Sequence, residues 1–534
     1  MPVLFFGRTM ALWALLISTL FALPPAAQAQ TTAFRQAVAE GAARDEALAE
    51  FYRARSFEGI WTGTSPEHAA RRNALLTAFA NAQQHGLPAS AYDPDALMAR
   101  LQAAQTAAEM GAMEVELSRL FVSYARDIQT GILTPGRVVS EIKREIPLRS
   151  RLGYLEGLTS ASPQAYLASL PPSSPEYARL LREKLRMEAL IAAGGWGPTV
   201  PGGKLEPGAS GSRVVALRDR LVAMGFMDRS ATQSYDAALE GAVLAFQAAH
   251  GLEQDGIAGE STLAELNIPA TRRLQQVIVA MERERWTNTP RGARHIWVNL
   301  TDFSASIMDN DSVTFTTRSV IGATDSDRQS PEFSDVMDHM VINPSWYVPR
   351  SIIVGEYLPA LQRNRNAVSH IEITDRNGRV VNRGAVNFSR YTARTFPFSM
   401  RQPPSSRNAL GLVKFMFPNQ YNIYLHDTPA KSLFGREIRA FSHGCIRLND
   451  PFDFAYALLA VQEGDPVGFF QGILNTGRER RVNLDEPVPV HIVYRTAFTH
   501  TTGQLNFRRD VYNRDSRIWN ALAGEGVVVR AIGG

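Results

Sequence analysis

The sequence contains a single cysteine, Cys445, among 534 residues. One cysteine excludes an intrachain disulfide and any zinc site built from several cysteines. A charge excess is also absent, because 56 Lys and Arg residues against 52 Asp and Glu residues leave a formal net charge of +4. That excess is too small and too dispersed to indicate a nucleic-acid-binding protein. The 45% of hydrophobic residues excludes a mostly disordered chain and is typical of globular domains with cores.

Apolar runs of membrane-spanning length are absent as well. The one run near the N-terminus extends from Ala11 to Leu23 and follows Arg8, and small residues at 27 and 29 stand where a signal peptidase reads. The run is shorter than the ~20 residues of a bilayer span. We therefore predict a cleaved signal peptide over residues 1–29 and a mature chain outside the cytoplasm. An uncleaved anchor remains the alternative.

The segment 30–193 is rich in Ala, Leu, Arg and Glu, and its apolar residues recur at helical spacing, as in Leu48, Phe51 and Tyr52. This pattern predicts a helical scaffold domain, and no motif in it carries chemistry. A Gly- and Pro-rich stretch over 194–208 predicts a linker.

The segment 209–268 predicts three short helices. Val214, Leu217 and Leu221 share one helical face, and Phe246 and Thr262 belong to the second and third helices. The pattern resembles the small three-helix peptidoglycan-binding domain. A helical spacer without a ligand is the alternative interpretation.

From about residue 293 the period changes from helical to strand-like, as in 296–300 and 313–321, which predicts a mainly β domain over 293–472. Within it, residues 350–405 form a polar insertion too long for a plain turn, which favours a functional role. A strand-like run over 488–494 indicates that the C-terminal segment 473–534 packs back onto the body of the protein.

The chemistry-bearing residues gather around the cysteine, in the stretch from Phe441 to Leu448. A strand-like run ends at His426 and Asp427, and a helix-capping Asn449 or Asp450 follows the cysteine. The thiolate is the nucleophilic form of cysteine, and a neighbouring imidazole can accept the thiol proton. Each feature alone has an ordinary structural explanation, such as a buried cysteine or a structural salt bridge of Arg447.

Taken together, these residues resemble the YkuD-type L,D-transpeptidase catalytic domain, whose motif is His, a spacer, and Ser/Thr-His-Gly-Cys-x-Asn/Arg. Here 15 residues separate His426 from Ser442, and Arg447 takes the last motif position. The blocks 343–350, 409–411 and 414–419 also resemble those of large periplasmic members. The resemblance implies an α+β multidomain fold: a helical scaffold domain, a small three-helix peptidoglycan-binding domain, and a mainly β catalytic domain whose insertion caps the substrate.

The resemblance also implies the catalytic roles. Cys445 is the expected nucleophile. His426 is the expected base, with its ring oriented by a backbone carbonyl such as that of Asp427. His443 is expected beside the thiol, supporting the oxyanion or the second proton transfer, and either histidine could be the base, although we favour His426. The residues expected to donate to the oxyanion or to line the substrate site are Gly444, Ser442, Arg447, Tyr424, Asp427 and Trp346.

The function implied is a periplasmic peptidoglycan L,D-transpeptidase that forms 3→3 cross-links through a cysteine thioester, releases D-Ala and is acylated by carbapenems. A carboxypeptidase that uses water, or a transferase that anchors a protein to the wall, would share this chemistry. A wall-binding structural protein with an inert thiol is the rival of a different class. The expected partners are stem peptides and glycan strands, with membrane contact only through the signal peptide, and no cofactor or metal is implied.

Overall fold

The computed structural model describes residues 25–325, 327–500 and 503–530. Residues 1–24, which hold most of the predicted signal peptide, lie outside the described residues. The chain divides into two compact units: residues 1–78, 93–123 and 149–167 form the first, and residues 79–92, 124–148 and 168–534 form the second. Within the described ranges, no helix combines the length and the apolar character that a membrane span requires.

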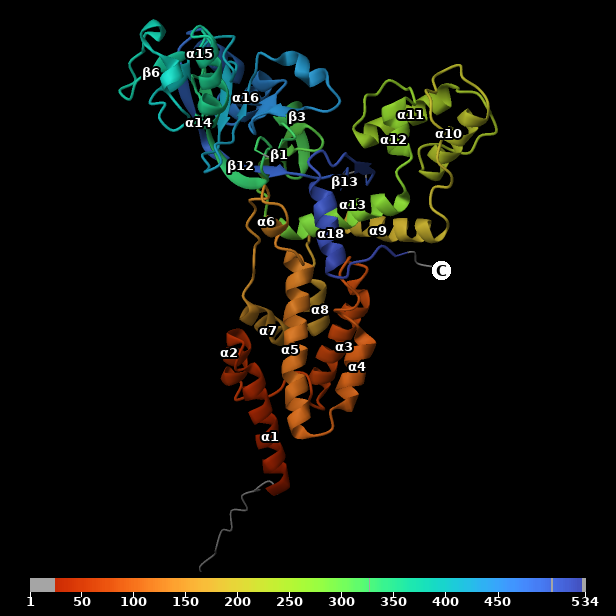
Figure 1. The fold of residues 1–534 in the computed structure, drawn as a ribbon. Helices are drawn as coiled ribbons and strands as arrows, with labels where there is room; N and C mark the ends of the chain where they lie inside the picture. Colours follow the sequence, from red (N-terminus) through yellow and green to blue (C-terminus); the bar gives the residue numbers. More distant parts are fainter. Residues whose placement is uncertain (1–24, 326, 501–502, 531–534) are drawn as a thin grey trace, which may run out of the picture. The chain divides into compact units, whose positions relative to one another are not determined.

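The N-terminal half is helical, as the sequence predicts, and Figure 1 shows these helices in red to orange. Buried Glu114 accepts the backbone N–H groups of Ile60, Trp61 and Thr62, and Tyr52 donates to the same carboxylate at 2.8 Å. One carboxylate therefore accepts the backbone N–H groups of a turn that lies outside any helix or strand. The helices are α1 (Pro25–Ala42), α2 (Glu46–Ala54), α3 (Pro66–Ala82), α4 (Pro94–Ala103), α5 (Ala107–Thr130), α6 (Pro135–Val138), α7 (Arg151–Ser160), α8 (Pro163–Ala168) and α9 (Pro175–Ala192).

Three short helices form a compact group after the Gly- and Pro-rich stretch: α10 (Ser212–Ala223), α11 (Ala237–His250) and α12 (Glu260–Leu266) (Figure 1). Asp236 caps α11 by accepting the N–H of Leu239, and Gly251 ends the helix with a left-handed φ of 64°. Val214, Phe246 and Leu263 lie in one shared apolar core. This small core is separate from the core of the sheet.

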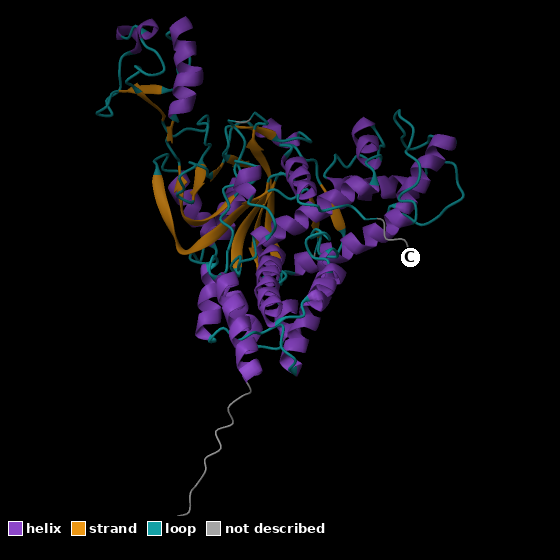
Figure 2. Cartoon of the chain, turned by 60° about the horizontal axis from the view of Figure 1, so that its bottom comes forward, coloured by secondary structure: helices purple, strands orange, loops and turns teal. Residues whose placement is uncertain are grey.

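The second half is built on one nine-stranded sheet of order β10-β3-β11-β9-β8-β4-β12-β1-β2, drawn in orange in Figure 2. Its strands are β1 (Arg294–Asn299), β2 (Ser304–Asp309), β3 (Ser312–Gly322), β4 (Phe333–Ile342), β8 (Val413–Met416), β9 (Leu425–His426), β10 (Ala440–Ser442), β11 (Ile446–Leu448) and β12 (Arg480–Val493). Strand β12 comes from the segment after residue 472, yet it lies inside the sheet between β4 and β1. The C-terminal segment is therefore part of the sheet core.

Helices complete this module. α16 (Pro451–Leu459) and α17 (Pro466–Leu474) pack their apolar residues into the core of the sheet. α13 (Ala270–Trp286) and α18 (Arg514–Gly524) share a second core with α9. A small hairpin joins β13 (Ala497–Thr499) to β14 (Leu505–Phe507).

The polar insertion has a core of its own. Strands β5 (Trp346–Tyr347), β7 (Ser399–Gln402) and β6 (Glu372–Thr374) form a separate three-stranded sheet. A helical stretch lies between β5 and β6 in the chain. It consists of α14 (Arg350–Ile352), a π-helical turn over Ile353–Tyr357, and α15 (Leu358–Arg363). Ile353, Leu361 and Phe396 are buried in the insertion's own apolar cluster. The insertion is thus a small folded lobe, and we call residues 350–405 the cap.

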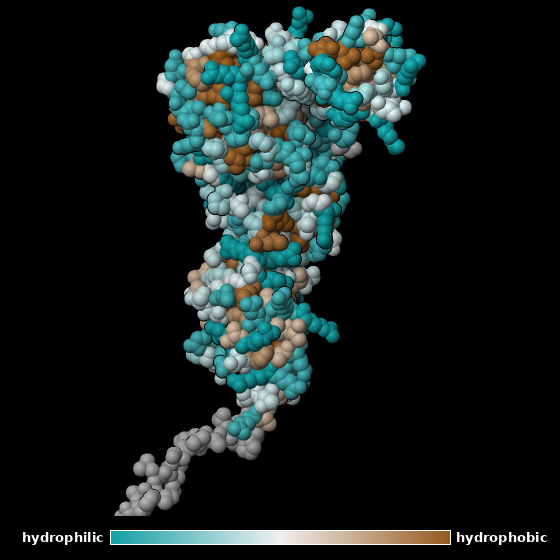
Figure 3. Space-filling model, turned by 90° about the vertical axis from the view of Figure 1, so that its left-hand side faces the viewer, coloured by the Kyte–Doolittle hydropathy of each residue, from teal (hydrophilic) through white to brown (hydrophobic). Residues whose placement is uncertain are grey.

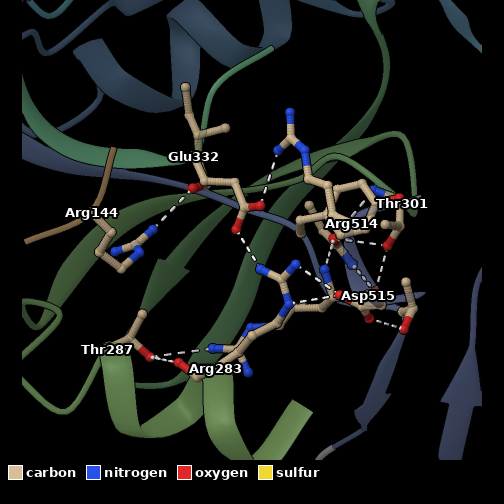
Figure 4. Close-up of polar contacts among 12 residues, drawn as sticks. Arg144, Arg283, Thr287, Thr301, Glu332, Arg514 and Asp515 are labelled. Atoms are coloured by element: carbon tan, nitrogen blue, oxygen red, sulfur yellow. Dashed lines mark hydrogen bonds and ion pairs between the residues drawn. The ribbon is translucent and has the colours of Figure 1, made fainter. Parts of the chain in front are cut away.

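Buried ion pairs join α13 and α18 to the sheet module. Figure 4 shows Glu332 between Arg283 of α13 and Arg514 of α18, at 2.6 and 3.0 Å, and Asp515 against the same Arg283 at 2.7 Å. These groups are almost completely buried, so removing one partner would leave an uncompensated charge. The network fixes α18 against the loop that precedes β4.

The α+β fold class predicted from the sequence is confirmed: helices dominate the first half and a large sheet dominates the second. On the face drawn in Figure 3 the surface is largely hydrophilic, and hydrophobic residues form separate patches. Exposed large hydrophobic residues such as Val313, Val380 and Val461 lie on different elements.

Candidate active site

Three neighbouring strands, β8, β9 and β11, position the candidate catalytic residues. Ile446 pairs with Leu425 and Arg447 with His426 in parallel register. Side chains alternate between the two faces of a strand, so Tyr424 and His426 share the face that Cys445 and Arg447 occupy. The opposite face carries Val413, Phe415, Leu425, Ile446 and Leu448, which are buried in the core. The register therefore brings the cysteine and His426 to diagonal positions on adjacent strands.

Cys445 is partly buried and lies immediately before β11. Its thiol donates to the carbonyl of Asn422 at 3.4 Å, and Asn422 holds a left-handed φ of 55°. Burial raises the pKa of the Cys445 thiol to about 11, although the Tyr424 N–H, the Tyr424 hydroxyl, Arg447 and Lys414 oppose this shift. The resting cysteine is therefore a neutral thiol with partners ready for its anion.

His426 is buried at the end of β9, and its Nδ1 lies 2.5 Å from the carbonyl oxygen of Asp427. A carbonyl only accepts, so Nδ1 carries the proton and Nε2 keeps the lone pair. Burial, the charge of Arg447 and the charge of Lys414 lower the pKa of His426 to about 3. The ring is thus neutral at physiological pH and has one nitrogen free to accept a proton.

Asp427 holds the turn that carries this carbonyl. Its carboxylate accepts the N–H of Leu412 at 2.9 Å, the N–H of Thr428 at 2.7 Å and the ammonium of Lys431 at 2.8 Å. Gly411 has a φ of 60°, and a Cβ there would stand 2.2 Å from an Asp427 carboxylate oxygen. Glycine at 411 therefore makes room for the carboxylate that orients the base.

The loop before Cys445 is held from two sides. Ser442 donates to the Cys445 carbonyl at 2.5 Å, and the Gly444 N–H donates to the Ser442 hydroxyl at 3.2 Å. Ser330 donates to the Gly444 carbonyl at 2.6 Å, and Arg514 of α18 donates to the Ser330 carbonyl at 2.7 Å. In a trans peptide the N–H opposes the C=O. The Cys445 N–H is thus directed away from Ser330, and no acceptor for it occurs among the described residues.

This geometry changes the expected oxyanion donors. Gly444 is among the residues expected to donate to the oxyanion, but in the structure its N–H donates to the Ser442 hydroxyl. Gly444 also has a φ of 107°, which only glycine adopts readily. The Cys445 N–H is not engaged in this way, and the oxyanion role of either N–H group remains a prediction.

His443 has a different neighbour from the one expected. Its side chain is exposed, and its Nε2 lies 2.6 Å from a carboxylate oxygen of Glu356 in the cap. Within the described ranges this is the one polar contact of the ring. The structure therefore connects His443 to the cap, and a catalytic role for it remains a prediction.

Tyr424 connects the sulfur to the cap. Tyr424 lies close to both groups, because the Cys445 sulfur raises the pKa of its hydroxyl and the Trp346 side chain lowers it. Burial raises the pKa of Tyr424 well above its usual value, which keeps the hydroxyl protonated. Tyr424 and Trp346 both belong to the apolar cluster of the cap.

Sequence reasoning missed Lys414 and Ser330. Lys414 on β8 pairs with His426 in the register, and Ser330 comes from the loop before β4. Lys414 begins the block 414–419, which resembles family members, but nothing in the local sequence distinguishes this lysine as a site residue. The contact from Ser330 spans 114 residues of sequence and had no local signature.

Comparison with known proteins agrees with this arrangement. Residues 293–468 match the model of the YkuD family, the L,D-transpeptidase catalytic domain. The chain contains an L,D-transpeptidase catalytic domain. Residues 210–266 match the model described as "Putative peptidoglycan binding domain", and residues 46–185 match a scaffold domain.

A similar protein of Haemophilus influenzae, named "Putative L,D-transpeptidase", is 28% identical over 246 residues. The match covers 45% of this chain and about half, 48%, of that relative. Among solved structures, an L,D-transpeptidase of Xylanimonas cellulosilytica matches 56% of this chain and 100% of its own, at 15% identity and a TM-score of 0.17. An L,D-transpeptidase of Stackebrandtia nassauensis matches 56% of this chain and 97% of its own, at 12% identity and a TM-score of 0.21.

Proposed function

We propose that this protein is a peptidoglycan L,D-transpeptidase that forms 3→3 cross-links through a thioester on Cys445. The observation that carries the proposal is the shared sheet face of Cys445 and His426, with His426 Nδ1 bonded to the Asp427 carbonyl. The donor would be a stem tetrapeptide that ends in diaminopimelate and D-Ala.

Acylation would begin at the thiol. As the sulfur attacks the carbonyl at the L-centre of diaminopimelate, Nε2 of His426 takes the thiol proton. The carbonyl oxygen becomes an oxyanion that accepts from the Cys445 N–H; one such donor is typically worth ~3 kcal/mol. The C–N bond then breaks, His426 returns the proton to the leaving nitrogen, and D-Ala departs as an amine.

The second half-reaction would use an amine of another stem peptide. That amine attacks the thioester, His426 takes its proton, and the sulfur leaves and regains the proton. The energy of the donor amide is held in the thioester, so no nucleotide is required outside the cytoplasm. Water must be kept from the thioester, and we assign this task to the cap; the packing of Tyr424 and Trp346 in its apolar cluster supports the assignment.

The remaining domains fit a wall enzyme. We propose that residues 1–29 are a signal peptide for export to the periplasm, and that the α10–α12 unit holds the enzyme on glycan strands. Its match to a peptidoglycan-binding model supports the second proposal. Carbapenem acylation of Cys445 belongs to the same hypothesis.

The test is incubation of the purified protein with tetrapeptide-bearing muropeptides, followed by mass spectrometry. We expect cross-linked dimers, released D-Ala and a carbapenem adduct on Cys445, all absent from Cys445→Ala. The absence of all three products from the wild-type protein would refute the proposal.

The acceptor separates the remaining alternatives. Tripeptide monomer as the sole product would indicate an L,D-carboxypeptidase that uses water, and a stem attached to an added protein amine would indicate protein anchoring. Sacculus binding with full cellular function in Cys445→Ala would indicate a wall-binding structural protein.

A further inference from the structure

Two cations flank His426 on the site face of the sheet. Lys414 of β8 pairs with His426 on one side, and Arg447 of β11 pairs with it on the other. Adjacent strands lie 4.7–4.9 Å apart, so the two backbones stand about 9.5 Å apart across the histidine. Both charges act on His426 and on Cys445. Both side chains therefore lie close to the reacting groups.

Neither cation has a partner among the described residues. Within the described residues no hydrogen bond or ion pair holds the Lys414 ammonium or the Arg447 guanidinium, although the charge of Glu479 acts on Lys414, and Arg447 Nε is buried without an acceptor. Burial lowers the pKa of Lys414 and of Arg447, because removal from water disfavours the charged form of each side chain. By contrast, buried Arg283 and Arg514 in the module core bind the carboxylate of Glu332.

Lys414 and Arg447 are both partly buried, and a partly desolvated cation without a bound anion favours an external partner. The reaction itself supplies one. The leaving nitrogen must lie at His426 to receive its proton, and in D-Ala that nitrogen sits on the carbon that bears the terminal carboxylate. The carbon of the carboxylate is therefore only two bonds from the nitrogen. With the nitrogen at His426, the carboxylate lies beside Lys414 and Arg447, the cross-strand neighbours of His426.

We propose that Lys414 and Arg447 form a carboxylate-binding pair that recognises the α-carboxylate of the amine leaving the acyl-enzyme. This inference rests on the proposed function and names the group by which the donor is selected. A donor with a free terminal carboxylate after the scissile bond places its anion between the two cations. A donor that is amidated or extended there has no anion at this point.

The same pair serves the entering amine. Each amine of diaminopimelate is carried on a carbon that also bears a carboxylate, so the acceptor presents the α-amino carboxylate arrangement that D-Ala had. One site then aligns both amines against His426. Water lacks a carboxylate and gains nothing from the pair, which favours transfer over hydrolysis.

The experiment compares two donors that differ in one group: a tetrapeptide ending in D-alanine and the same peptide ending in D-alaninamide. Release of D-alanine or D-alaninamide is measured for the wild type, Lys414→Met, Lys414→Arg and Lys204→Met. Lys204 is an exposed lysine paired with Glu206 and serves as the matched control. Thermal unfolding verifies that each variant is folded.

We expect the wild type to favour the carboxylate donor by about tenfold or more in kcat/KM, the range of a charge-assisted hydrogen bond. Lys414→Met should remove most of this preference by lowering kcat/KM for the carboxylate donor alone, and Lys414→Arg should restore it. Lys204→Met should match the wild type. Equal use of both donors by the wild type, or an equal loss with both donors in Lys414→Met, would overturn the inference. No release from any donor would instead refute the proposed function.

Discussion

The pH dependence of Cys445 chemistry follows from two opposed pKa shifts. The thiol pKa is raised to about 11 and the His426 pKa is lowered to about 3. A gap of about 8 units at 1.36 kcal/mol per unit puts full proton transfer in the resting site at about 11 kcal/mol before the attraction between the resulting thiolate and imidazolium is counted. At their ordinary values of 9.0 and 6.5 the same transfer would cost about 3 kcal/mol. A turnover of about 10 per second corresponds to an activation barrier of about 16 kcal/mol. Formation of a Cys445 thiolate–His426 imidazolium pair before attack would account for most of that barrier.

The site is therefore expected to react from its neutral form, with the proton leaving as the sulfur–carbon bond forms. Acylation by a carbapenem should be nearly independent of pH from 5 to 9, because neither group titrates there. Alkylation by iodoacetamide, which needs thiolate, should rise about tenfold per pH unit between pH 7 and 10. Both rates are measured by the mass of the adduct on Cys445.

His426→Gln is the matched control for this experiment. It should lower the acylation rate by about 10²–10⁴, the usual contribution of a general base, and leave the alkylation slope in place. Acylation and alkylation that both level off with a midpoint between pH 5 and 7 would show a preformed thiolate–imidazolium pair and would refute the reasoning.

Three further predictions concern the turn beside the base, a largely buried histidine of β12 and the cap. Gly411→Ala should lower the free energy of unfolding, measured in urea, by about 2–4 kcal/mol, because the added Cβ displaces buried Asp427. The loss should be smaller when Asp427 is itself replaced by alanine. Burial lowers the pKa of His491 to about 4, so the neutral ring stabilises the folded protein fully above pH 6.5, and this contribution is lost as the pH falls towards 4. His491→Gln should reduce the unfolding free energy lost between pH 7.5 and 5 by about 2 kcal/mol. An unchanged slope of unfolding free energy against pH would contradict this. Glu356→Gln should weaken the cap contact to His443 and speed hydrogen exchange over 350–363, whereas unchanged exchange would contradict a latch.

The sequence predicted most of the fold because its signals are local. Helical periodicity, as in Leu48 and Phe51, and the change to strand-like runs at about 293 depend on near neighbours. The position of β12 inside the sheet could not be predicted, because its pairing with β4 and β1 joins residues more than 100 positions apart. The cap was visible as a polar stretch of unusual length, but its own apolar core was not.

The site shows the same division. Cys445 and His426 stand out because their spacing forms a motif, and Asp427 is adjacent in sequence to the base that it orients. Lys414 and Ser330 reach the site through strand register and a long-range contact, which leave no trace in local sequence. The partner of His443 was also out of reach, since Glu356 lies 87 residues away in a separate lobe.

The most direct test of the central claim is the mass of the protein trapped during turnover of a tetrapeptide donor. We expect a tripeptide thioester on Cys445, one D-Ala released per adduct, no adduct in Cys445→Ala and much slower formation in His426→Gln. Release of D-Ala at the wild-type rate by Cys445→Ala, or an adduct on another residue, would contradict it.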